Sequence, residues 1–183
     1  LDLNRLFEDE NLLSQTDSGQ GETQKEKQDK VYRRFIIVTC GGVNYGVPVE
    51  HAKELTYCEA VDEMFCHGCI KGVLRLRGRR IPVVDSLVLL DRKIDTKQMP
   101  EGNDDTRRIL IIEASDIRFG MIMDTVHRIL TVGTHEILPM PFQEQQSVTG
   151  LYETDQESTI MLLDVDKLIR NHLEALQSIA HVK

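Results

Sequence analysis

The fold is decided by the stretch Ile70-Lys71-Gly72-Val73-Leu74-Arg75-Leu76-Arg77-Gly78-Arg79-Arg80-Ile81-Pro82-Val83-Val84-Asp85. Two runs rich in β-branched residues, 70–76 and 81–84, flank a basic tip in which Gly78 can adopt a positive φ without steric cost, so the pattern predicts a β-hairpin. Because side chains alternate along a strand, Leu74 can face a core while Arg75 faces water. Pro82 lacks a backbone N–H and belongs at a strand start or an edge.

Composition is typical of a soluble globular domain. The 183 residues are 40% hydrophobic and 28% charged, which suits one ordinary domain with its own core. The net charge of −8 argues against nucleic-acid binding, which needs a positive field. Every apolar run is far shorter than the ~20 residues that span a bilayer, and no signal peptide opens the chain. We therefore expect a cytoplasmic protein, without direct membrane insertion and with reduced cysteines.

The first 30 residues differ in composition from the rest. They hold eight acidic and four basic residues, and 14–30 contains no aliphatic residue. Such a segment cannot bury enough apolar area to offset its ordering entropy, so we predict a flexible acidic tail over 1–30. The weak helical spacing of leucines over 1–13 would suit a short docking helix.

From Val31 onward the chain predicts short strands joined by hairpins. The expected strands and turns are 35–39 and 43–49 around Gly41-Gly42, 108–113 and 117–124 around 114–116, and 148–152 with 158–163. A short helix is expected over 50–57 and a terminal helix over about 164–179, with Asp164 as its N-cap. A second half starts at about 107, and Phe119-Gly120-Met121 matches Tyr45-Gly46-Val47 of the first half.

Three blocks carry a family resemblance: Ile70-Lys71-Gly72-Val73, Leu76-Arg77-Gly78 and Ile81-Pro82-Val83-Val84-Asp85. Their order and spacing resemble the signature of the CheW family of chemotaxis coupling proteins. The likeness extends over 31–183 and includes Glu54-Leu55 and the block 119–126. One departure is the turn 65–69, which lacks the proline of the family pattern. The resemblance implies a mainly β fold of two intertwined, SH3-like five-stranded β-barrel subdomains with a C-terminal α-helix.

The resemblance also implies a function. Such proteins are non-catalytic adaptors that hold no cofactor or metal and couple the cytoplasmic tip of chemoreceptors to the regulatory domain of the chemotaxis histidine kinase, in membrane-associated arrays. By position, the implied binding residues are Arg77, Glu54, Lys71, Gly72, Ala52 and Val83. Arg77 would brace Glu54 and present its guanidinium at the receptor groove. A structural role is the alternative for Gly72, through a bulge or a close backbone contact, and for Ala52 and Val83, as core residues.

Two other interpretations stay open. The chain opens on Leu1 rather than Met, so it could be a CheW-like domain cut from a larger protein: a kinase regulatory domain, a receiver-linked coupling protein or an array organiser. Alternatively, Cys66-x-x-Cys69 has the spacing of a zinc half-site, with Cys58 as a third ligand, which would indicate a zinc- or thiol-dependent protein. No phosphate-binding loop, nucleophile elbow or metalloprotease motif supports an enzyme.

Overall fold

The computed structural model describes residues 31–58, 61–62, 68–91, 107–140, 147–155, 158–172 and 176. Its strands are β1 (Tyr32–Cys40), β2 (Val43–Pro48), β3 (Ala52–Tyr57), β4 (Val61–Asp62), β5 (Ile70–Leu76), β6 (Arg79–Val84), β7 (Arg108–Ala114), β8 (Ile117–Met123), β9 (Thr125–Gly133), β10 (Val148–Glu153) and β11 (Thr159–Leu163). The helical elements are η1 (Val49–His51), α2 (Ser86–Leu89), η5 (Thr134–Glu136) and α3 (Val165–Asn171).

Three hairpins have the same two-residue turn. The turns are Gly41-Gly42 between β1 and β2, Arg77-Gly78 between β5 and β6, and Ser115-Asp116 between β7 and β8. All six turn residues have φ values between 49° and 77°. Two consecutive positive φ values define a type I′ turn, whose twist matches that of the flanking strands. The hairpins expected at these three places are confirmed.

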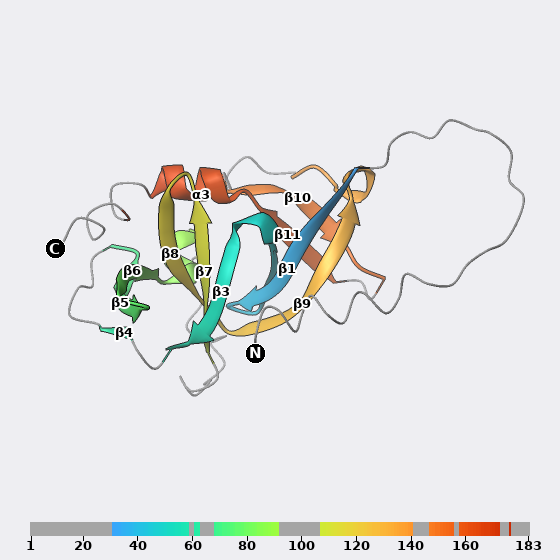
Figure 1. The fold of residues 1–183 in the computed structure, drawn as a ribbon. Coiled ribbons are helices and arrows are strands. Elements are labelled where there is room, and N and C mark those ends of the chain that lie inside the picture. Colours follow the sequence, from blue (N-terminus) through green and yellow to red (C-terminus); the bar gives the residue numbers. More distant parts are fainter. Residues whose placement is uncertain are drawn as a thin grey trace, which may run out of the picture.

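The strands form two sheets, each of which takes strands from both halves of the sequence (Figure 1). The first sheet has the order β10-β11-β2-β1-β9, and the second has the order β3-β7-β8-β6-β5-β4. Each contains one parallel pair, β11 with β2 and β6 with β8, that joins two antiparallel hairpins. The mainly β fold is confirmed, and the described two-residue strand β4 adds a sixth strand to the second sheet.

The central strands are buried on both faces. In β1, Phe35 and Ile37 face a cluster inside the first sheet with Val132, Ile160 and Leu162, which we call the first interior cluster. In β7, Ile109 and Ile111 face the second interior cluster, with Leu74, Ile81 and Val83. The alternate residues of these strands, Ile36, Val38, Leu110 and Ile112, all face a larger cluster between the sheets, which we call the shared cluster. Each sheet therefore curls around its own interior and packs against the other.

Two glycines permit this curling at equivalent places. Gly46 of β2 lies beside Leu162 in the parallel pair, and Gly120 of β8 lies beside Val83 in the other. A Cβ on Gly120 would lie 2.5 Å from Cγ2 of Ile109. On Gly46 it would lie 2.7 Å from Cδ2 of Leu162. The match between the two Tyr/Phe-Gly segments is thus a shared packing role at each barrel interior.

The helical expectations are met only in part. The short helix expected over 50–57 is wrong, because the chain forms η1 and then strand β3, which pairs with β7. Asp164 caps α3 as expected, with its carboxylate accepting the N–H of Lys167 at 2.9 Å. Leu176 is described as helical and buried, whereas most positions after 172 lie outside the described residues. The tail 1–30 also lies outside them. No described helix is long and apolar enough to cross a membrane.

We expect Gly120→Ala to lower the free energy of unfolding by about 1–3 kcal/mol, because the new methyl group meets the stiff β-branched Ile109. Gly46→Ala should cost less, since its nearest neighbour is the mobile end of Leu162. Urea titration followed by circular dichroism measures both, with exposed Thr131→Ser as the control. A Gly120→Ala variant as stable as this control would contradict the packing described.

Candidate functional site

The tip of the β5–β6 hairpin meets strand β3. Nη2 of Arg77 lies 3.2 Å from Oε1 of Glu54, as a hydrogen bond and ion pair. In the sheet order, β3 and β5 are separated by three strands, so this contact spans the curled sheet. The Arg77 side chain is 80% exposed and that of Glu54 is 31% exposed. An ion pair this exposed contributes little to stability, so its value lies in where it holds the guanidinium.

Arg77 has an unusual backbone for an arginine. Its φ of 49° is in the left-handed region, which glycine, asparagine and aspartate adopt more readily than longer side chains. The first position of a type I′ turn is best filled by Asn or Asp. Turn formation alone therefore does not favour an arginine at this position.

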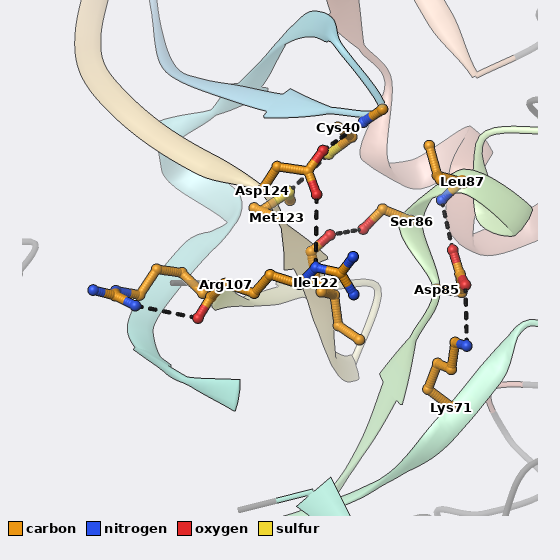
Figure 2. Close-up of polar contacts among 11 residues, drawn as sticks. Cys40, Lys71, Asp85, Ser86, Leu87, Arg107, Ile122, Met123 and Asp124 are labelled. Atoms are coloured by element: carbon orange, nitrogen blue, oxygen red, sulfur yellow. Dashed lines mark hydrogen bonds and ion pairs between the residues drawn. The ribbon is translucent and has the colours of Figure 1, made fainter. Parts of the chain in front are cut away.

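The base of the same hairpin carries a second ion pair. Nζ of Lys71 lies 3.6 Å from Oδ2 of Asp85 (Figure 2). The other carboxylate oxygen of Asp85 caps α2, accepting the N–H of Leu87 at 3.0 Å and that of Val88 at 3.4 Å. Lys71 is half exposed and stays accessible beside this cap.

The remaining sequence-predicted residues lie deeper. A Cβ on Gly72 would lie 2.5 Å from the Asp62 carbonyl oxygen, so glycine is required by the close approach of β4. Ala52 is half-buried and packs against the shared cluster. Val83 has no exposed surface and belongs to the second interior cluster. The structure thus brings Arg77 and Glu54 into contact, places Lys71 at the hairpin base, and gives the other three a packing environment. A binding role for those three stays a prediction.

A cavity of about 90 Å³ lies between the two sheets, and sequence reasoning did not find it. Its lining includes two cations and two carboxylates, and Figure 2 shows how they converge from separate elements. Asp124 accepts the N–H of Gly41 at 2.6 Å and lies 3.9 Å from Nε of Arg107. Ser86 donates a hydrogen bond to the Ile122 carbonyl oxygen. Among these polar contacts, the one from Gly41 to Asp124 links the β1–β2 turn of the first sheet to the residue that follows β8 of the second.

Cys40 and Cys69 have the properties of structural thiols. Burial, with a contribution from the Asp124 carboxylate, raises the pKa of Cys40 from 9.0 to about 12. Burial also raises the pKa of Cys69. Cys69 is a free thiol, while Cys66 lies outside the described residues. Within the described part of the chain, no three His, Cys, Asp or Glu side chains are grouped to hold a metal ion.

Comparison with known proteins matches this arrangement to one family. The family model described as the CheW-like domain matches residues 34–172. The chain is 24% identical over 164 residues to "Chemotaxis protein CheW" of Klebsiella aerogenes, covering 87% of this chain and 95% of that protein. It is 30% identical over 118 residues to the protein of that name in Bacillus subtilis, covering 61% and 69%. The solved scaffolding protein TtCheW from Thermoanaerobacter tengcongensis has the same fold, with a TM-score of 0.64, 20% identity, and coverage of 80% and 94%.

We expect Cys40 to resist alkylation by iodoacetamide at pH 8 while the protein is folded. Only the thiolate reacts, and a thiol with a pKa of about 12 is almost entirely protonated at that pH. Reaction should begin only on unfolding in guanidinium, and peptide mass spectrometry would locate the modified residue. Modification of Cys40 in the native protein at the rate of a free thiol would contradict this environment.

Proposed function

Because the chain belongs to the CheW-like domain family, we propose that it is a non-catalytic adaptor that couples chemoreceptors to the chemotaxis histidine kinase. Its partners would be the helical cytoplasmic tip of the receptor and the regulatory domain of the kinase. Its place would then be the cytoplasm, at membrane-associated receptor arrays. The name "Chemotaxis protein CheW", shared by relatives of which this chain covers 69% to 95%, supports the proposal.

One observation carries the assignment of the site: an exposed arginine is held in a strained conformation at a turn. Arg77 has a φ of 49°, and its guanidinium forms an ion pair with the Glu54 carboxylate. Strain that persists in a well-packed structure is a pointer to function. A guanidinium fixed by one carboxylate keeps further N–H groups for a partner, which an ammonium could not present in the same plane.

The other named residues have graded roles in this proposal. Lys71, half exposed at the hairpin base, would contact the partner directly. Gly72, Ala52 and Val83 would act by holding the hairpin and β3 in place, because the structure surrounds each of them with packing contacts. The docking surface would therefore be a rigid hairpin tip beside a sheet-edge strand, suited to a preformed helical partner.

We predict that Arg77→Asn weakens binding of a receptor-tip fragment by about 10–100-fold, the loss typical when a charged hot-spot residue is removed. Its free energy of unfolding should stay within about 1 kcal/mol of the parent, because Asn suits the left-handed turn position and the lost ion pair is exposed. Isothermal titration calorimetry and urea unfolding give the two numbers.

Arg128→Asn is the matched control, since Arg128 is an exposed arginine on β9, outside the second sheet. It should leave receptor-tip binding unchanged. Equal affinity of Arg77→Asn and the parent protein would remove Arg77 from the site. A loss of binding accompanied by unfolding would assign it a structural role instead.

A further inference from the structure

Four arginines crowd the β5–β6 hairpin. They are Arg75, Arg77, Arg79 and Arg80, and all four are exposed. Arg75 and Arg80 are directly opposite each other in the strand register. Like charges in directly opposite positions disfavour strand pairing, so pairing alone does not account for two arginines here. We call this group the arginine surface.

The described structure neutralises this surface only in part. Glu54 is the carboxylate that contacts Arg77. Within the described part of the chain, the side chains of Arg75 and Arg79 make no ion pair or hydrogen bond. The whole chain nevertheless has a net charge of −8, so the surface is a local reversal of its overall charge.

The complementary charge lies at the start of the chain. Residues 1–24 contain six acidic residues against one basic residue, Arg5, a net charge of −5. Three of the acidic residues are consecutive: Glu8, Asp9 and Glu10.

We propose that residues 1–24 bind in cis to the arginine surface of the same molecule. Arginine pairs with carboxylates through two parallel hydrogen bonds, which are stronger than neutral ones. The 31 residues before β1 can span at most about 110 Å, whereas a folded domain of about 150 residues has a radius of gyration of roughly 15 Å. Covalent attachment adds a local concentration on the order of millimolar, so weak charge pairing suffices.

The chain's own carboxylates suit this surface better than a polyanion would. A nucleic acid or an anionic membrane would be repelled by the net charge of −8 of the molecule, to which residues 1–24 themselves contribute −5. If the proposed function holds, this contact also competes with the receptor for Arg77, and the segment regulates adaptor binding.

The test uses the full chain without any partner. The variant Glu8→Gln/Asp9→Asn/Glu10→Gln should change the ¹⁵N–¹H shifts of the 75–80 amides and of the arginine Nε groups at about 20 mM salt. The change should vanish at about 1 M salt, where the Debye length is roughly 3 Å. A matched control, Asp116→Asn/Glu153→Gln/Asp155→Asn, removes three exposed carboxylates elsewhere and should leave these resonances unmoved.

The proposal would be overturned if the tail substitutions left the hairpin chemical shifts unchanged at low salt. It would also be overturned if the shift changes grew with protein concentration, because the contact would then be with a second copy. A further experiment separates this inference from the proposed function. The tail variant should bind a receptor-tip fragment several-fold more tightly than the parent. Shifts at the hairpin without this gain would confirm the cis contact and count against Arg77 as the receptor-binding residue.

Discussion

The structure depends on central strands that are buried on both faces. In β1 and β7, odd and even residues face different clusters, one inside the strand's own sheet and one between the sheets. A register slip of one residue would exchange these two sets, and every side chain would meet a space shaped for another. Because both faces are buried, neither strand can relax toward water. The register of the hairpins, and hence the position of their tips, is fixed by this packing.

Because this packing fixes the backbone, a weak ion pair can still mark the proposed binding site. The pair between Arg77 and Glu54 is too exposed to hold the sheet closed. The second interior cluster does this instead, since Leu74 and Ile81 from the hairpin pack with Ile109 and Ile111. Because the core sets the backbone positions, packing does not dictate the side chain at position 77, and we propose that the arginine serves partner binding. Its left-handed backbone conformation is the visible cost of that choice.

The sequence predicted what local patterns determine. Turn glycines and alternating apolar runs located the hairpins, and the two Tyr/Phe-Gly segments indicated the internal likeness of the halves. The helix expected over 50–57 was wrong, because residues with helical propensity, such as Ala52 and Leu55, are held as a strand by pairing with β7. The cavity beside Asp124 was missed because residues 41, 107 and 124 meet only in the folded chain. For Val83 the sequence allows a groove position but favours the core, and the structure places it in the second interior cluster.

We propose that the receptor docks on the Arg77 hairpin and β3, where packing has already fixed the backbone. Hydrogen–deuterium exchange of the full chain, with and without a chemoreceptor cytoplasmic-tip fragment, tests this most directly. We predict added protection of amides in Ala52–Tyr57 and in the β5–β6 hairpin, with the β10–β11 hairpin of the other sheet unchanged. Protection at β10–β11 alone, or none at the Arg77 hairpin under conditions where the fragment binds, would contradict it.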